Sequence, residues 1–200
     1  SAPVLGEYTS DIKTTPRKAR IPTGTNSLPL DGVRVICFTQ AWAGTYGTEL
    51  LALLGADVVQ IETVKRPDVW RGAGSPVPPG IRNPDIRQNP LNNNGMYNTV
   101  NLNKRAITLD MANPKGKEMF WAMVPNFDVI ADNFSPHVMA NWGVTLETLN
   151  QARPGMIMAS VSGYGRTGPL AEYAANGATT EPMAGLSSIH GYSGEQGQNT

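Results

Sequence analysis

Blocks of apolar and polar positions alternate along the chain, and they predict strands and helices in turn. The run VRVICF (33–38) is almost continuously apolar, as in a strand buried on both faces of a parallel sheet. TYGTELLALLG (45–55) carries leucines at helical spacing and ends on a glycine that can stop a helix. DVVQIE (57–62) is a second apolar strand. Strand, helix and strand in such a short stretch predict a βαβ unit whose two strands are parallel neighbours.

The same alternation continues towards the end of the chain. Further strands are predicted at 106–111, 128–132 and 156–163. Helices are predicted at 113–124, 135–143, 145–153 and 178–189, the last of them interrupted near Pro182. The first three begin at residues that favour helix N-termini, Asn113, Ser135 and Thr145. Strands that alternate with helices predict an α/β fold with a mostly parallel sheet and flanking helices.

Two segments break this pattern. Residues 1–28 are polar, rich in Pro and Thr and without periodicity, so we expect an N-terminal arm that is disordered or wraps over a partner. The folded part is expected to be 29–200. Residues 65–98 are rich in Pro, Gly, Asn and Arg, and a loop of this length inside a compact domain is usually functional or disordered.

Composition narrows the function classes. Sixteen basic and sixteen acidic residues balance, which argues against nucleic acid or an anionic membrane as a partner chosen by bulk charge. No apolar run approaches the length of a membrane span, and no metal site is predicted. The single cysteine, Cys37, lies in an apolar strand pattern and is expected to be a core thiol. One cysteine allows no disulfide within the chain, so a cytoplasmic location is expected.

The loop after the first predicted strand, TQAWAGTYG (39–47), is the first candidate for chemistry. Ligands of open α/β sheets bind beyond the carboxyl ends of the strands, and a helix N-terminus there favours an anion. The loop has neither the G-x-G-x-x-G spacing nor a Walker A motif. A nucleotide-like ligand and a plain βα turn therefore both fit. Glu62 could likewise meet a ribose hydroxyl, or it could serve packing or a salt bridge.

Four stretches together resemble one family. They are PLDGVRVICFTQAWAG, LLGADVVQIE, NLNKRAITLDM and DVIADNFSPHVMANWGV with the later ARPGMIMASVSGYGRTGP. In this order and spacing they are similar to the N-terminal half of the family III CoA-transferases, which include formyl-CoA transferase, the carnitine CoA-transferases and alpha-methylacyl-CoA racemase. The resemblance runs from about Pro29 to about Gly194. It implies part of a Rossmann-like large domain, without the family's small domain, and two chains threaded through each other as rings.

The resemblance also implies an activity. Family transferases move CoA between carboxylic acids through an anhydride and a thioester on an aspartate, which is nucleophilic carboxylate catalysis. Coenzyme A would be a substrate rather than a permanently bound cofactor, and the partners would be an acyl-CoA, a small carboxylic acid and either a second copy or a related subunit. Two alternatives stay open: a 2-methylacyl-CoA racemase, and a non-catalytic CoA-binding subunit of a heteromeric transferase.

The resemblance to the family implies several site residues in this chain, for different reasons. CoA contacts are expected at Gln40, Ala41, Ala43, Lys104, Arg105, Leu109, Asn133 and Phe134. For Lys104 and Arg105 the reason is that phosphate recognition favours basic side chains, although a solvated surface position fits both equally well. Trp42 stands where some relatives carry a functional glutamine, so it is a candidate for the wall of the acyl pocket.

The resemblance assigns no catalytic residue within the chain. The family's nucleophilic aspartate lies in a G-D motif that would follow residue 200, and the racemase's histidine has no counterpart near Asn176. Glu181 is the nearest carboxylate, and it aligns elsewhere. We therefore expect residues 1–200 to be catalytically inactive on their own.

Overall fold

Five parallel strands form the centre of the protein. The structure is a computed structural model that describes residues 4–7, 27–71, 90–92 and 94–191. The sheet has the order β3-β2-β1-β4-β5, and every neighbouring pair is parallel. Its strands are β1 (Arg34–Phe38), β2 (Asp57–Glu62), β3 (Arg105–Thr108), β4 (Val129–Asp132) and β5 (Ile157–Ser160). The α/β fold predicted from the sequence is confirmed.

The predicted βαβ unit is also confirmed. β1 and β2 are parallel neighbours with Val35 opposite Val58, and α1 (Ala43–Leu53) connects them. Gly55 ends the connection with φ +106°, a conformation that side-chain-bearing residues rarely adopt. From β1 the chain adds β2 and β3 on one side of β1, and it then adds β4 and β5 on the opposite side. The strand order therefore reverses between β1 and β4.

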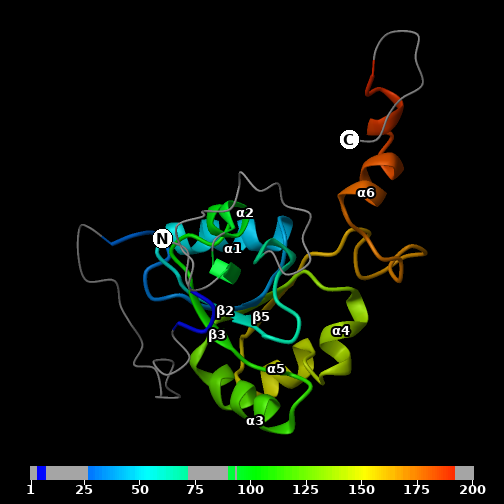
Figure 1. Ribbon diagram of the computed structural model, residues 1–200. Coiled ribbons are helices and arrows are strands. Elements are labelled where there is room, and N and C mark those ends of the chain that lie inside the picture. The colour runs from blue at the N-terminus through cyan, green and yellow to red at the C-terminus, as the bar shows by residue number, and fades with distance from the viewer. Residues whose placement is uncertain (1–3, 8–26, 72–89, 93, 192–200) are drawn as a thin grey trace.

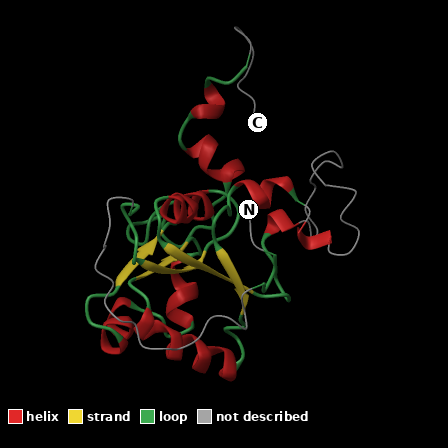
Figure 2. Ribbon diagram, turned by 90° about the vertical axis from the view of Figure 1, so that its left-hand side faces the viewer, coloured by secondary structure: helices red, strands yellow, loops and turns green. Residues whose placement is uncertain are grey.

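Helices cover both faces of the sheet (Figures 1 and 2). α1 lies on one face, where Val35 and Cys37 of β1 pack in a cluster with Ala52 of that helix. Ile36 and Phe38 of β1 belong to the larger cluster on the other face, which includes side chains from α3 (Pro114–Met123), α4 (Pro136–Asn141) and α5 (Leu146–Ala152). Burial on both faces explains why β1 reads as an unbroken apolar run.

Local capping explains where these helices begin. The Asn113 side chain accepts the backbone N–H of Lys115, and Pro114 occupies the first turn of α3. Thr145 and Thr148 form a reciprocal capping box at the start of α5. Cys37 is a buried free thiol, as predicted, and burial raises its pKa.

Two predicted strands are longer in the sequence pattern than in the structure. The run 106–111 keeps strand geometry only to Thr108, and 156–163 only to Ser160. Leu109 and Val161 still donate their N–H groups to Glu62 and Asp132 of the neighbouring strands, and residues 109–111 then line a cavity. The apolar character that extended the predicted strand therefore belongs to a site wall.

The loop 65–98 contains short elements that have no sequence periodicity. They are the single turns η1 (Val69–Arg71) and η3 (Pro90–Asn92) and the helix α2 (Gly95–Thr99). Residues 72–89 and 93 of this loop, and 8–26 of the predicted arm, lie outside the described residues. Within the arm, Leu5 donates its backbone N–H to Asn92 Oδ1 at 3.1 Å.

The last described segment projects from the sheet. α6 (Gly177–Met183) contains Pro182, and the turn η5 (Leu186–Ser188) follows it, so the predicted interruption near Pro182 is confirmed. None of the seven residues of α6 is buried. Both views show this segment extending away from the layers that cover the sheet (Figures 1 and 2).

Candidate functional site

The loop between β1 and α1 lies at the point where the strand order reverses. Gln40 follows β1, and Asn133 follows β4, so both leave the carboxyl edge of the sheet. The Gln40 N–H donates to Asn133 Oδ1 at 2.8 Å, and Asn133 Nδ2 donates back to the Gln40 carbonyl at 2.7 Å. This reciprocal pair fixes the loop against the end of β4, in the crevice where open α/β sheets bind ligands.

A small residue lets α1 approach this loop. A Cβ on Gly44 would come within 2.8 Å of Asn133 Cβ and Thr39 Cγ2, so a larger residue would push the helix away. Across the described ranges, no side chain caps the N-terminus of α1, whose N-cap residue is Trp42. The first-turn N–H groups of this 11-residue helix can therefore stabilise a developing negative charge on a bound ligand.

A cavity of about 110 Å³ opens beside the loop. Its walls come from the ends of β1 and β2 and from the segments after β3 and β4. It is lined by Phe38, Gln40, Ile61, Glu62, Thr63, Leu109, Asp110, Met111, Ala112, Phe134 and Trp142. Three residues predicted to contact CoA thus lie around one hollow: Gln40, Leu109 and Phe134.

The aromatic side chains give the cavity its chemical character. Phe134 and Trp142 meet edge to face, with ring centroids 5.7 Å apart, and Phe38 lies 6.5 Å from Phe134. Flat apolar walls of this kind suit a planar ring or an alkyl chain. The volume is below the range typical for a whole ligand, so the hollow can receive only part of a molecule as large as CoA.

The structure does not bring Lys104 and Arg105 to this cavity. Lys104 is 3% exposed, and its ammonium donates to the carbonyls of Thr45 and Val100 and to Asn101 Oδ1. Burial lowers the pKa of Lys104. Arg105 begins β3 and forms an ion pair with Asp57, which begins β2, so this pair lies at the amino edge of the sheet.

Trp42 and Glu181 also lie apart. Trp42 is 48% exposed and meets Trp70 edge to face at 5.9 Å, beside the loop. Glu181 lies on the projecting α6 and lines a separate open hollow with Thr180 and His190. Of the remaining predicted contacts, Ala41 follows Gln40 directly and Ala43 begins α1.

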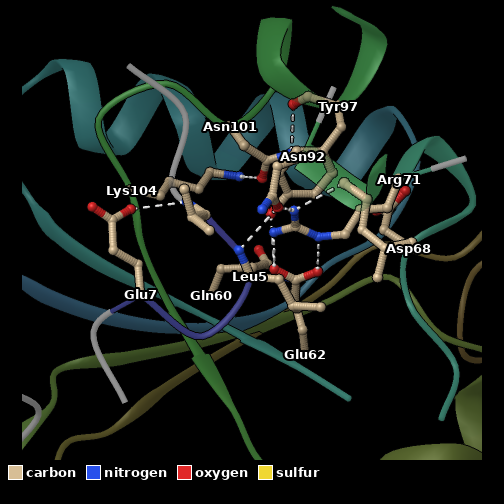
Figure 3. Close-up of polar contacts among 12 residues, drawn as sticks. Leu5, Glu7, Gln60, Glu62, Asp68, Arg71, Asn92, Tyr97, Asn101 and Lys104 are labelled. Atoms are coloured by element: carbon tan, nitrogen blue, oxygen red, sulfur yellow. Dashed lines mark hydrogen bonds and ion pairs between the residues drawn. The ribbon is translucent and has the colours of Figure 1, made fainter. Parts of the chain in front are cut away.

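Sequence reasoning missed a buried ionic cluster behind the loop (Figure 3). Arg71 is fully buried and makes two 2.6 Å contacts with the Glu62 carboxylate, so Glu62 serves a salt bridge. Asp68 is also buried and accepts the Ala41 N–H at 2.9 Å. The signal in the sequence was the cluster of three charged residues in RPDVWR (66–71), and it carried no periodicity.

The carboxylates around the site already have partners within the chain. Glu62 pairs with Arg71, and Asp110 at the cavity wall pairs with Lys65 at 2.7 Å. Asp132, at the end of β4, accepts the Ser160 hydroxyl at 2.5 Å. In the part of the chain that the structure describes, no group of His, Cys, Asp and Glu could hold a metal ion, and no helix is long and apolar enough to cross a membrane.

Curated proteins that are similar in sequence to this chain include CoA-transferases. Formyl-CoA:oxalate CoA-transferase from Rhodopseudomonas palustris strain TIE-1 is 39% identical over 136 residues, which is 68% of this chain and 29% of that protein. Succinyl-CoA–D-citramalate CoA-transferase from Chloroflexus aurantiacus is 33% identical over 164 residues, which is 82% of this chain and 38% of that one. The chain therefore matches well under half the length of these curated relatives.

Solved structures show the same architecture. A CAIB/BAIF family protein from Brucella suis superposes with a TM-score of 0.74 at 28% identity, over 88% of this chain and 44% of that chain. An orthorhombic crystal form of Rv3272 from M. tuberculosis gives a TM-score of 0.72 at 26% identity, over 86% and 45%. The family model for CoA-transferase family III matches residues 30–200. The chain belongs to CoA-transferase family III.

Proposed function

We propose that this chain binds an acyl-CoA and supplies the CoA-binding part of an enzyme that moves CoA between carboxylic acids. One observation carries the proposal. The loop that Asn133 holds at the strand-order reversal borders an aromatic cavity lined by Gln40, Leu109 and Phe134. Family membership makes a CoA thioester the ligand class that fits this arrangement.

In this proposal the chain's own residues bind and orient the thioester. The cavity receives an apolar or planar part of CoA against Phe134 and Trp142, and the thioester lies at the Gln40–Trp42 loop. When a carboxylate attacks the thioester carbonyl, charge develops on its oxygen, and the first-turn N–H groups of α1 can stabilise it. Trp42 forms a wall beside the acyl group.

The attacking carboxylate is assigned outside residues 1–200. This carboxylate displaces the CoA thiolate and forms an acyl anhydride with the enzyme. The thiolate then attacks the enzyme's own carboxyl carbon, which forms an enzyme thioester and releases the first acid. The second acid reverses both steps and leaves as the new acyl-CoA. The partnered state of Glu62, Asp110 and Asp132 supports this assignment, because each is already held by a neighbouring group. The interlocked dimer, or a heteromer with a related subunit, and the cytoplasmic location stay predictions.

Transfer by the natural full-length protein tests the proposal. Purified enzyme would be incubated with an acyl-CoA and a panel of free acids, and new CoA thioesters would be identified by mass spectrometry. Acid-dependent exchange supports a transferase, whereas deuterium uptake at the α-carbon without exchange would show the racemase alternative. Residues 1–200 alone should give neither reaction. Turnover by them that disappears in Glu181→Gln would make Glu181 the nucleophile and overturn the assignment.

Trp42→Gln tests the acyl wall in the same assay. The expected result is a changed preference among acids with the CoA dissociation constant unchanged, because the cavity that receives CoA does not include Trp42. An unchanged acid preference with a large loss of CoA affinity would contradict the assignment.

A further inference from the structure

The Gln40–Trp42 loop has an unfavourable backbone conformation at its centre. Ala41 has φ +57°, in the left-handed region that residues with a side chain avoid. Its N–H donates to Asp68 Oδ2 at 2.9 Å. The reciprocal pair with Asn133 holds only the preceding residue, Gln40. At Ala41 itself, Asp68 holds the N–H, and the carbonyl accepts the hydroxyl of Thr45 on α1.

Asp68 is built to hold that position. It is 3% exposed, and its second oxygen, Oδ1, accepts the Trp70 N–H at 2.7 Å. Its backbone carbonyl accepts the Arg71 N–H at 2.9 Å. One carboxylate thus connects the loop after β1 to the turn η1, which is distant from the loop in sequence, and each of the two N–H groups has its own carboxylate oxygen.

The turn η1 is itself anchored to the sheet (Figure 3). The Arg71 guanidinium donates twice to Glu62, the last residue of β2, and its centre lies 3.7 Å from the centroid of the Tyr97 ring. Tyr97 Oη donates to Glu62 Oε1 at 2.8 Å, and Arg71 Nη1 donates to Asn92 Oδ1 at 2.7 Å. A paired, hydrogen-bonded buried charge of this kind holds its neighbours in one geometry.

The same turn also contacts the side chain that follows Ala41. Trp70 of η1 meets Trp42 edge to face at a centroid distance of 5.9 Å. The segment from Asp68 to Arg71 therefore touches the loop at two points, the Ala41 N–H through Asp68 and the Trp42 ring through Trp70. In the proposed function the thioester lies at this loop, and Trp42 forms a wall beside the acyl group.

We propose that Asp68 is a positioning residue for the reaction: through Ala41 it fixes the Gln40–Trp42 loop, and so sets the geometry at the acyl end of the bound thioester. This inference rests on the proposed function and adds a residue that acts through another. The competing explanation is that Asp68 only caps η1 and stabilises the fold. The two differ in what happens to Ala41 and to the two substrates when Asp68 changes.

Amide hydrogen exchange, followed by NMR, tests the positioning without any assumption about activity. Asp68→Asn keeps the side-chain shape but has one acceptor for two N–H groups. Exchange at the Ala41 amide should become about tenfold faster, the factor by which a left-handed alanine is disfavoured. The Gln40 amide, which Asn133 still holds, should not change. Equal acceleration at both amides, or none at Ala41, would overturn the proposal.

Steady-state kinetics of the natural enzyme test the consequence for the reaction. Asp68→Asn should lower kcat for transfer about tenfold, the factor by which a left-handed alanine is disfavoured. The CoA dissociation constant should stay unchanged. Asp57→Asn is the control, because it removes one charge from an ion-pair cluster at the opposite edge of the sheet. Similar kinetic effects of the two variants would reduce Asp68 to a structural role.

A second substitution provides the rescue. Glycine adopts a positive φ without strain, so Ala41→Gly in the Asp68→Asn background should restore part of the lost kcat. No recovery would contradict the proposal. If Asp68→Asn does not fold, Asp68→Ser, which keeps a shorter acceptor, takes its place in all three measurements. A wild-type enzyme without CoA transfer would refute the proposed function, while the exchange at Ala41 would still decide whether Asp68 fixes the loop.

Discussion

At the residue scale, Asn133 is the clearest link between sequence and site. The resemblance marks it as a CoA contact, and the structure shows both ends of its amide bound to the backbone of Gln40. In the proposed function, Asn133 would therefore affect the ligand through the loop that it holds. Neither the partner nor this indirect action could be predicted, because 93 residues separate the two positions in sequence.

Asn133→Asp tests this role. The carboxylate still accepts the Gln40 N–H, but it faces the Gln40 carbonyl without a donor, which costs about 1–3 kcal/mol. CoA affinity, measured by calorimetry, should fall about thirtyfold, which corresponds to the middle of that range. Asn150→Asp is the matched control, since Asn150 also uses both ends of its amide on backbone groups, but on α5 and the turn after it. Equal losses in both variants would contradict the account.

The ionisation of Asp68 gives a pH dependence with a defined sign. Burial raises the pKa of Asp68 above the ordinary aspartate value, although the Trp70 and Ala41 N–H groups oppose the shift. Between the ordinary and the raised pKa the folded protein binds a proton that the unfolded chain does not. The contribution of Asp68 to stability is therefore present below the ordinary pKa and lost as the pH rises through the raised one.

Chemical unfolding of wild type and Asp68→Asn over this acidic range checks the sign. The free energy of unfolding of the wild type, minus that of the variant, should increase as the pH falls. A difference that shrinks instead would mean that the two N–H groups outweigh burial and that the pKa is lowered.

At the element scale, burial and capping decided what could be predicted. β1 and β2 were predictable because both of their faces are buried, and α3 and α5 because Asn113 and Thr145 cap them. The turn η1 and the helix α2 were not predictable, because three and five residues are too short to show a period. The ionic cluster behind the site depends on these short elements, so it could not be found either.

The capping box at α5 gives a stability prediction. Thr145→Ala removes the acceptor for the Thr148 N–H and should lower the free energy of unfolding by about 1 kcal/mol. Urea denaturation measures the change. Thr99→Ala is the control, because Thr99 donates to a backbone carbonyl on its own helix and caps no N–H group. A loss in Thr145→Ala no larger than in the control would contradict the assigned cap.

At the scale of the whole molecule, α1 presents apolar side chains on both sides. Its inner side packs on the sheet. Four apolar side chains on the outer side are between 44% and 53% exposed: Tyr46, Leu50 and Leu53 on the helix, and Leu54 directly after it. Their spacing places them on one face of the helix. Such a face favours contact with another surface.

Association of residues 1–200 in solution follows from this face. Sedimentation velocity should show concentration-dependent self-association, and Leu50→Lys with Leu53→Lys should reduce it, because two charges would interrupt the apolar face. Glu118→Gln with Glu147→Gln, on α3 and α5, raises the net charge by the same amount and serves as the control for charge alone. A wild-type sample that stays monomeric at every concentration would contradict the prediction.

The central claim is that CoA binds beside the Gln40–Trp42 loop, with part of the molecule in the cavity of Phe134 and Trp142. A crystal structure of the protein with CoA tests it most directly, compared with the same crystals without ligand. The account predicts ligand density along the carboxyl edge of β1 and β4, in contact with Gln40, Leu109 and Phe134. Density confined to the amino edge, where Arg105 pairs with Asp57, or to the hollow around Glu181, would contradict it.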